Sequence, residues 1–432
     1  MNEFFVKNLK LIFLSIFAIA VTFYTLPFFG TADMSSWMTN AAVNLEYGPI
    51  KAYTVYNMYY PPLSSAIIWM TAKISGISYQ KSWLDDYPSI IEVGDEYMPI
   101  KYSILFFTIL SIIFLQRYIG KKLTTRFTES MIWVFLNPGM IWVSLILSYI
   151  DIYIVPTLIL SFYFIGKKMN FLSGCMLTLT FLIKLIPIFL IPAFLAFYIQ
   201  LIFKPFKFRL NYRSMLWFMA GAIITFLVVF TYYSRQEFAH IIDMSSRHGI
   251  YLNFNAMNIH WLIRQYFITT NVAPHKLILL SKVLFFVISG FLLFNQLLQK
   301  DKNLGLLKSC LGILFTYTMF FTGAHENHIF STFILSLLLY FKYPSKYHKS
   351  LYFNLSLILF LNLFLFYRFG QGSPLSQLDF LSTNTSLRIF LITISTIYTI
   401  LVYKYHLYLE YLEIRDSLSR KELFSQVDKK NC

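Results

Sequence analysis

The sequence predicts an all-α polytopic membrane protein with about 12 transmembrane helices. Of its 432 residues, 57% are hydrophobic and only 13% are charged, which leaves too little polar surface for a soluble chain of this length. The apolar residues also fall into separate runs, many of them near the roughly 20 residues that cross a bilayer. The expected spans are 9–29, 99–117, 128–147, 152–166, 171–184, 187–203, 215–233, 277–298, 307–322, 329–342, 351–367 and 387–405.

The basic residues indicate how the spans are oriented. A net charge of +16 would suit a nucleic-acid partner, but the Lys and Arg residues sit in short clusters between apolar runs. This pattern is typical of cytoplasmic membrane loops, so we expect no nucleic acid as a partner and membrane lipids around the chain. The clusters occupy residues 121–126, 167–168, 204–213, 300–302 and 342–349.

The number of membrane crossings between two basic clusters decides whether the run 61–77, which begins in YYPPL, spans the membrane. Lys7 and Lys10 place the N-terminus inside, so residue 30 emerges outside, and the cluster at 121–126 must again be inside. The chain must then cross the membrane an odd number of times between residue 30 and the cluster at 121–126. A single crossing by 99–117 meets this condition. The run 61–77 is expected to lie on the outer leaflet as an interfacial helix. A true span at 61–77 stays open as an alternative, because the charge rule is a bias.

This threading gives a single transmembrane domain over residues 1–405, and its polar features collect on the external side. Two large external loops, 30–98 and 234–276, belong to it. Residues 406–432 form a charged cytoplasmic tail, either helical or disordered. Chain length and the single domain suggest a monomer.

Asp33 follows the first span directly, at the membrane boundary. A carboxylate at this depth can be a general base, because it is close to lipid and still wet enough to ionise. The alternative is a structural one, in which Asp33 caps an interfacial helix that starts at Met34.

Asp151 and Lys184 stand at two external turns. Asp151 ends the stretch NPGMIWVSLILSYID, in which Asn137-Pro138 breaks or kinks a span, and a lone Asp in a tight hairpin is usually part of the turn. Lys184 lies between two short apolar runs. A cation on the outer side is disfavoured, so we expect it to have a partner or an anionic ligand, unless its side chain extends to the lipid headgroups.

Two further external stretches carry groups that suit a phosphate. In SSRHGIYLNFNAMNIHW, Arg247 precedes His248-Gly249, and a guanidinium can hold a phosphate with two donors. In TGAHENHIF, His325, Glu326 and His328 stand at the head of a span. They could bind zinc, but the metalloprotease spacing is absent, and two imidazoles beside a carboxylate could instead bind a phosphate or a sugar hydroxyl.

Taken in order along the chain, these segments resemble those of the GT-C glycosyltransferases, and most closely the dolichyl-phosphate-glucose enzymes and their bacterial relatives. Asp33 stands where that family keeps its catalytic Asp, and YYPPLSS, with Tyr60, is similar to its YPPL segment. In the turn before Asp151, Ser148 and Tyr149 replace the family's Gly and Gln. The segments SRHG…NAMNIHW, with Asn258, and GAHENHIF are similar to two later motifs, in the second of which Asn327 replaces a Lys.

The resemblance implies a GT-C fold and an inverting transfer of a hexose, glucose or mannose, from a polyprenyl-phosphate donor without a metal or other cofactor. It implies Asp33 as the catalytic base, and the following residues as ligands of the donor phosphate: Arg247, Lys184, His325 and His328. It implies substrate contacts for the following residues: Asp151, Tyr60, Glu326, His248 and Asn258. The acceptor would be an envelope glycan such as O-antigen, or another lipid-linked acceptor. The enzyme would be multi-pass in a bacterial inner membrane, with its site facing the periplasm.

Two other classes of protein remain as alternatives. A flippase or transporter of a lipid-linked saccharide would also be polytopic, although such proteins often have repeated halves and none is visible here. Another lipid-phosphate-dependent transferase of the cell envelope would use the same cationic residues with a different leaving group.

Overall fold

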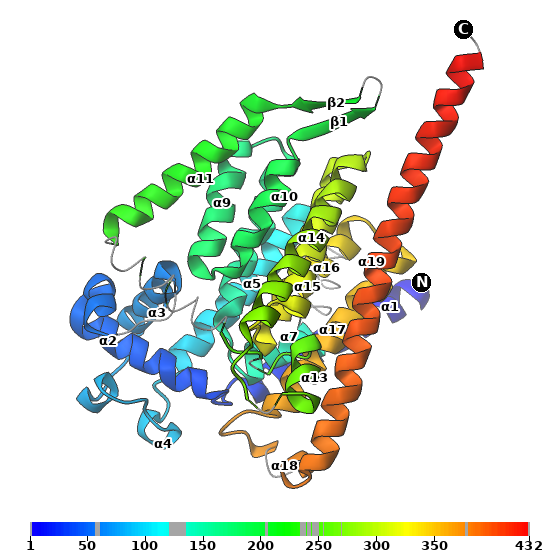
Figure 1. Ribbon diagram of the computed structural model, residues 1–432. Coiled ribbons are helices and arrows are strands. Elements are labelled where there is room, and N and C mark those ends of the chain that lie inside the picture. Colours follow the sequence, from blue (N-terminus) through cyan, green and yellow to red (C-terminus); the bar gives the residue numbers. More distant parts are fainter. Residues whose placement is uncertain are drawn as a thin grey trace.

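The protein is an elongated helical bundle with two unlike ends (Figure 1). The computed structural model describes residues 2–56, 61–120, 135–203, 206–233, 250–253, 255–268, 270–375 and 379–430, together with Ala239 and Asp243. In Figure 1 the bent helix α2 (Ala32–Val55) and the short helices α3, α4, α13 and α18 (Phe380–Thr383) lie at the lower end, while the β1–β2 hairpin and the last turns of α19 lie at the upper end. The candidate site residues belong to the lower end.

Six helices in the described part of the chain are long and apolar enough to cross a membrane. A seventh crossing is possible if the bent pair Pro138–Ile146 and Ile150–Gly166, whose axes meet at 104°, counts as one broken span. The protein is therefore a polytopic membrane protein. The predicted set of about 12 spans is larger than these six or seven because it also counts shorter apolar segments. The six helices are α5 (Met98–Ile119), α11 (Tyr212–Tyr232), α14 (His275–Leu298), α15 (Lys302–Phe320), α17 (Lys346–Tyr367) and α19 (Thr385–Lys430).

Four predicted spans form helices that are shorter or less apolar. The apolar part of α1 (Asn2–Thr25) begins at Ile12, and the other three have at most 14 residues each. Such segments need neighbouring helices, as the complete burial of much of α16 illustrates. These three are α9 (Asn170–Ile183), α10 (Ile191–Ala196) with the 3₁₀ turn η4 (Ile186–Leu190) before it, and α16 (Ile329–Lys342).

One predicted span, 187–203, is helical only as far as Ala196, so the fold is mostly helical instead of all-α. Helix α10 ends at Ala196, and the chain continues into an antiparallel hairpin of β1 (Ile199–Phe203) and β2 (Phe206–Leu210). The segment FKFRL alternates apolar and basic residues with a period of two, which favours a strand over a helix. The basic cluster at 204–213 therefore lies at and beside a hairpin.

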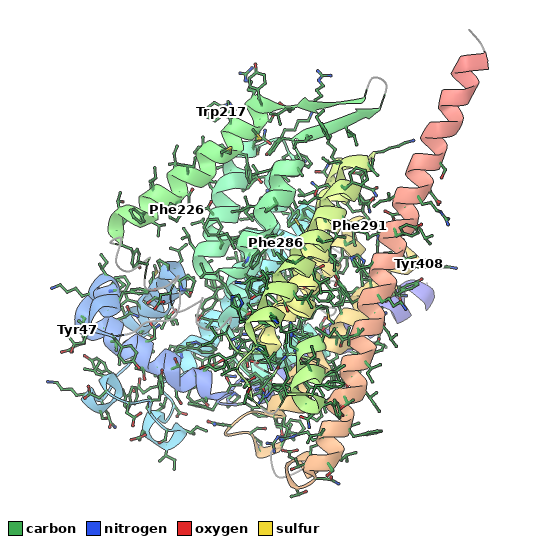
Figure 2. The ribbon with its side chains drawn as sticks, in the orientation of Figure 1. Tyr47, Trp217, Phe226, Phe286, Phe291 and Tyr408 are labelled. Carbon is green, nitrogen blue, oxygen red and sulfur yellow. The ribbon has the colours of Figure 1, made fainter. Side chains whose placement is uncertain are left out.

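Exposed apolar side chains cover the outer helices, as expected for a surface in contact with lipid. Trp217 on α11 is 56% exposed, Phe286 on α14 is 66% exposed and Tyr408 on α19 is 54% exposed. Figure 2 labels all three on the outer helices of the bundle. In water such a surface would be a large apolar patch, so its extent favours a membrane environment.

Glycines allow α9 and α11 to pack closely. A Cβ atom on Gly174 would lie 2.0 Å from the carbonyl oxygen of Phe218, and one on Gly221 would lie 2.0 Å from that of Phe171. Small residues at such a crossing let two backbones approach each other, which is the usual way that helices associate in lipid.

The described part of the loop expected to be external, 30–98, forms helices that lie over the lower end of the bundle. Helix α2 (Ala32–Val55) bends at Gly48, and α3 (Pro62–Ser75) follows it. With 14 residues, α3 falls short of the roughly 20 that a span needs, in keeping with the expectation that 61–77 does not cross. The 3₁₀ turn η1 (Lys81–Leu84) and the short helix α4 (Ile90–Val93) complete the loop.

Two polar contacts fix α3 in place. The Asn44 side-chain amide donates to Ser65 Oγ at 3.0 Å, which joins α2 to α3. Ser64 Oγ donates to the carbonyl oxygen of Ile183 at 2.6 Å, at the end of α9. The external loop is therefore tied to the residue that precedes Lys184.

The tail predicted at 406–432 continues α19 as a helix to Lys430. Its first turns belong to the bundle, because His406 and Glu410 are only 1% and 2% exposed. The helical alternative is confirmed for the described part of the tail.

Candidate functional site

The junction between α1 and α2, just before Asp33, is held in place by backbone contacts of Gly30. Gly30 has a φ of +107° and its backbone pairs with that of Gln371. A Cβ atom at Gly30 would lie 2.6 Å from the carbonyl oxygen of Leu147, so only glycine fits this approach to the break between α7 (Pro138–Met140) and α8 (Ile154–Gly166). Asp33, three residues later, is thereby held against the turn that carries Asp151.

Asp33 does not cap its helix. The helix begins at Ala32, and the cap is Thr31, whose hydroxyl accepts a hydrogen bond from the Asp33 backbone N–H at 3.3 Å. Within the described residues the Asp33 carboxylate accepts no hydrogen bond, although its side chain is only partly exposed. The structural alternative considered from the sequence is therefore wrong, and the carboxylate is available for chemistry.

The surroundings of Asp33 raise its pKa from 3.8 to about 6. Removal from water is the largest cause, since it disfavours the charged form. The positive charge of Lys184 acts in the opposite direction, and the negative charge of Asp151 raises the pKa further. Asp33 therefore lies within electrostatic range of both residues.

Asp151 and Lys184 form an ion pair. Asp151 lies on the 3₁₀ turn η3 (Ile150–Tyr153) and its side chain is only 3% exposed, while Lys184, at the end of α9, is 22% exposed. Asn327 completes the group by donating from Nδ2 to Asp151 Oδ2 at 3.1 Å. The prediction that Lys184 has a partner is confirmed, and Asp151 is more than a turn residue because two side chains bind its carboxylate.

Glu326 is a third buried carboxylate, on the turn η5 (Glu326–His328) that precedes α16. Tyr149 donates its hydroxyl proton to Glu326 Oε1 at 2.6 Å, and Asn362 donates to the Glu326 carbonyl oxygen. The other carboxylate oxygen, Oε2, has no hydrogen-bond partner. Burial raises the pKa of Glu326 to about 7, and the negative charge of Asp33 also raises it.

Tyr149 was missed by the sequence reasoning, which expected Asp151 alone to act in this turn. The chain reverses sharply here, and Ser148 adopts a φ of +63°. This left-handed conformation favours glycine, the residue found at the matching position of the GT-C pattern. The replacement of Gly-Gln by Ser148-Tyr149 was the available signal, because it puts a phenol two residues before Asp151.

His325 and His328 lie on either side of Glu326 and pack against each other. Their ring centroids are 5.0 Å apart, and His328 Nδ1 accepts a hydrogen bond from the His325 backbone N–H at 3.1 Å. Both side chains are half-buried. The residues that the structure describes contain no group of three His, Cys, Asp or Glu that could hold a metal ion.

Asn258 has a structural role in place of the expected substrate contact. It caps helix α13 (Ile259–Tyr266) by accepting from the Trp261 backbone N–H at 3.1 Å, and its Nδ2 donates to the Thr318 carbonyl oxygen at 3.0 Å. Its side chain is fully buried and its amide is already used within the protein. The other expected residues, Tyr60, Arg247 and His248, lie outside the described part of the chain.

Fold and site together define an integral membrane protein with an acid–base centre at one end of its bundle. Asp33, Asp151, Lys184 and Glu326 come from four separate segments, and each lies within electrostatic range of at least one of the others. Raised carboxyl pKa values beside a cation are typical of sites that transfer protons.

The chain belongs to glycosyltransferase family 87, a membrane family of the GT-C type, whose model matches residues 59–322, more than half of the sequence. No curated protein matches it. The protein is therefore a glycosyltransferase, and membership in this family overturns the transporter alternative. The matched range begins at the YYPPL segment and contains Asp151 and Lys184, whereas Asp33 and Glu326 lie outside it.

Proposed function

We propose that this glycosyltransferase moves a hexose, glucose or mannose, from a polyprenyl-phosphate donor to an envelope glycan such as O-antigen or to a lipid-linked acceptor, with inversion at the anomeric carbon. The observation that carries the proposal is the state of Asp33. It is a desolvated carboxylate without a hydrogen-bond partner in the described chain, and its pKa is about 6. Such a group is mostly ionised at neutral pH and is a stronger base than an ordinary carboxylate.

In the proposed reaction, Asp33 takes the proton of the acceptor hydroxyl as its oxygen attacks the anomeric carbon. The bond between that carbon and the phosphate oxygen breaks on the opposite side, and polyprenyl phosphate leaves with the electron pair. The glycosidic bond forms in the same step, so no enzyme-bound sugar intermediate arises.

Lys184 is our first candidate for stabilising the leaving phosphate. It is cationic, partly exposed and oriented by Asp151, so it can approach a ligand without being wholly buried. His325 and His328 would add donors beside it, and Arg247 is proposed from its sequence motif. Asp151 and Glu326 are proposed to contact the substrates, together with Tyr60 and His248 from their motifs.

The substitution Asp33→Asn tests the proposed base. With polyprenyl-phosphate hexose supplied to membranes, the rate of transfer is expected to fall by about 10²- to 10⁴-fold, the usual contribution of general base catalysis. The protein should unfold at the same temperature or higher, because the substitution removes a poorly solvated charge.

Asp85→Asn is the matched control, since Asp85 is an exposed carboxylate of the same external loop, and it should keep full activity. Turnover of Asp33→Asn at the parent rate would remove Asp33 from the role of base.

We also propose that the enzyme is a monomer in a bacterial inner membrane, with Asp33 on the periplasmic side. Ile91 on α4 is 93% exposed, so Ile91→Cys in a chain whose native cysteines are replaced should react with an impermeant maleimide in intact spheroplasts. Lys300→Cys, in an exposed position between α14 and α15, should react only after permeabilisation. The reverse pattern of labelling would contradict the orientation.

A further inference from the structure

A polar cavity opens at the lower end of the bundle, between α13, the end of α17 and the first turns of α19. Its volume is about 670 Å³, and side chains from all three helices line it. The hydroxyl of Tyr266 and Thr393 Oγ1 are 2.8 Å apart in a hydrogen bond that joins α13 to α19 beside the cavity. This contact holds the two walls together.

Two arginines give the cavity its charge. Arg264, in the last turn of α13, and Arg388, in the first turn of α19, both line it. Neither guanidinium has an ion-pair or hydrogen-bond partner among the described residues, and no carboxylate is found among the described residues of the lining. Two unpaired guanidiniums facing one cavity favour a ligand with negative charge, above all a phosphate.

Beside the two arginines and polar side chains such as Gln265, the lining has an apolar part, and the cavity lies next to the first turns of a candidate membrane span. Phe366 and Ile392 contribute to the lining, and Ile392 belongs to a buried cluster with Trp261. Arg388 stands at the start of the membrane-spanning part of α19, and the neighbouring Phe390 is 58% exposed. A ligand that matches both parts has an anionic headgroup and an apolar chain, which is the chemistry of a lipid phosphate.

The cavity adjoins the candidate active site through Asn255, which lines it. Asn255 donates from Nδ2 to the Tyr367 hydroxyl at 3.4 Å, and its backbone pairs with that of His325. The Tyr367 ring lies 6.3 Å from the ring of Tyr149, which in turn binds Glu326. A headgroup held in the cavity therefore lies only a few side chains from the buried carboxylates.

We propose that this cavity binds the phosphate of a membrane lipid through Arg264 and Arg388, with the lipid chain against its apolar wall, and that a lipid-linked substrate of the transferase docks here. Only the second part rests on the proposed function. Two sources could supply the same chemistry, a polyprenyl-phosphate substrate and a phospholipid of the bilayer.

The experiment measures lipid binding to the purified full-length protein in neutral detergent by native mass spectrometry. The probes are farnesyl phosphate, farnesol, phosphatidylglycerol and inorganic phosphate. The variant Arg264→Gln with Arg388→Gln should bind farnesyl phosphate about 10- to 100-fold more weakly than the parent, as expected for lost hydrogen bonds to a charged group. Binding of farnesol should not change.

The control is Arg415→Gln, an exposed arginine on the far part of the same helix α19, which should bind all four probes as the parent does. Arg264→Gln alone changes only an exposed side chain, so it gives a folded protein if the double variant does not fold. Tighter binding of farnesyl phosphate than of phosphatidylglycerol would assign the cavity to the substrate, and the reverse would assign it to the bilayer.

Unchanged binding of both lipid phosphates in the arginine variants would overturn the proposal, as would displacement of farnesyl phosphate by inorganic phosphate at equal concentration. Asp33→Asn should bind farnesyl phosphate at this cavity as the parent does. The arginine variants test lipid binding, and Asp33→Asn tests the transfer rate. A negative result in one experiment therefore leaves the other proposal standing.

Discussion

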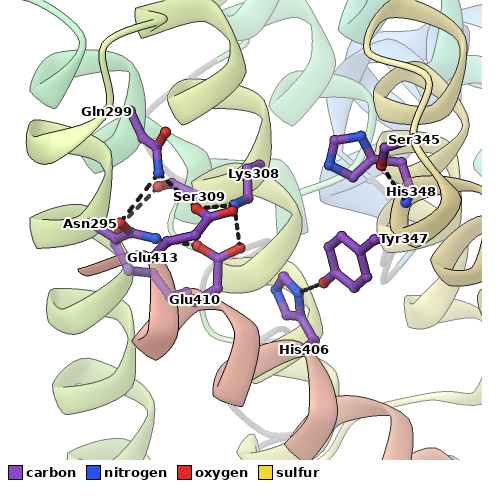
Figure 3. A network of polar contacts seen from close by, with 11 residues as sticks. Asn295, Gln299, Lys308, Ser309, Ser345, Tyr347, His348, His406, Glu410 and Glu413 are labelled. Carbon is purple, nitrogen blue, oxygen red and sulfur yellow. Dashed lines mark hydrogen bonds and ion pairs between the residues drawn. The ribbon is translucent and has the colours of Figure 1, made fainter. Parts of the chain in front are cut away.

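Two buried ion pairs lie at opposite ends of the bundle, and they differ in what surrounds them. At the hairpin end, which the proposed orientation makes the inner end, Lys308 of α15 pairs with Glu410 at 3.0 Å and Glu413 at 2.5 Å, both on α19 (Figure 3). At the opposite end, named the outer end on the same proposal, Lys184 pairs with Asp151. Each pair joins segments that are far apart in the sequence.

The inner group is closed by its own neighbours. Asn295 of α14 donates to Glu410, and Gln299, which follows α14, donates to Glu413, so three helices meet at one lysine (Figure 3). Both carboxylates of the group contact the cation, and Lys308 is only 4% exposed. This arrangement is suited to holding α19 against the bundle.

At the outer group, some carboxylates and buried polar atoms lack ion-pair or hydrogen-bond partners among the described residues. Asp33 lies within electrostatic range of the pair, and Glu326 lies within range of Asp33, but neither carboxylate forms an ion pair with Lys184 among the described residues. Glu326 Oε2, Asn327 Oδ1 and Ser148 Oγ are buried without hydrogen-bond partners. Buried polar atoms without hydrogen-bond partners reduce stability, but among the described residues they also occur near the inner group, at Gln296 Oε1 and His406 Nε2. The outer group is distinguished by Asp33, a desolvated carboxylate that accepts no hydrogen bond from the described residues. We therefore expect the inner pair to stabilise the fold and the outer pair to serve the proposed transfer.

The largest expected effect on stability comes from breaking the inner pair. Lys308→Met leaves Glu410 buried without its cation, which should lower the free energy of unfolding by about 3–5 kcal/mol. Chemical denaturation in detergent measures this change. The transfer rate per folded molecule should stay at the parent level, because the site is at the other end.

Arg415→Gln is the control for that prediction. It breaks an exposed pair with Asp416 on the same helix and should cost at most about 1 kcal/mol. A Lys308→Met protein as stable as the parent would contradict the structural role of the inner group.

Breaking the outer pair should affect activity more than stability. Asp151→Asn leaves Lys184 without its negative partner and lets the ammonium group move away from the donor phosphate. We expect the apparent KM for polyprenyl-phosphate hexose to rise by about 10-fold, the equivalent of one charge-assisted hydrogen bond.

The free energy of unfolding of Asp151→Asn should fall by only about 1 kcal/mol, because Lys184 is partly exposed to solvent. Steady-state kinetics and denaturation of the same preparation measure the two effects. A loss of stability as large as that of Lys308→Met, with an unchanged KM, would show that both pairs are structural.

The smallest effect is a shift in pH dependence. Because the pKa of Asp33 is raised to about 6, the base becomes protonated as the pH falls, and kcat/KM should drop about tenfold per unit below pH 6. The positive charge of Lys184 lowers this pKa, so Lys184→Met should move the acid limb to higher pH. Initial rates between pH 5 and 8 measure the shift, and a flat profile in that range would exclude Asp33 as the titrating base.

Hydropathy alone located most of the helices. The run 329–342 coincides with α16, and 277–298 lies within α14, because apolar length is a local property of the chain. The hairpin at 199–210 was missed because the apolar run before it masked a period-two pattern. The inner ion pair was also missed, since Lys308 lies within a predicted span and its partners lie in the predicted tail.

By itself, the sequence determined the class of protein and singled out Asp33, Asp151, Lys184 and the segment around Glu326 as candidate site residues. Only the tertiary structure decided which of these groups meet. Lys184 and Asp151 are 33 residues apart, and Tyr149 and Glu326 are 177 apart, so no local pattern joins them. Burial and charge proximity, which set the pKa of Asp33, arise from packing between segments and are therefore properties of the fold.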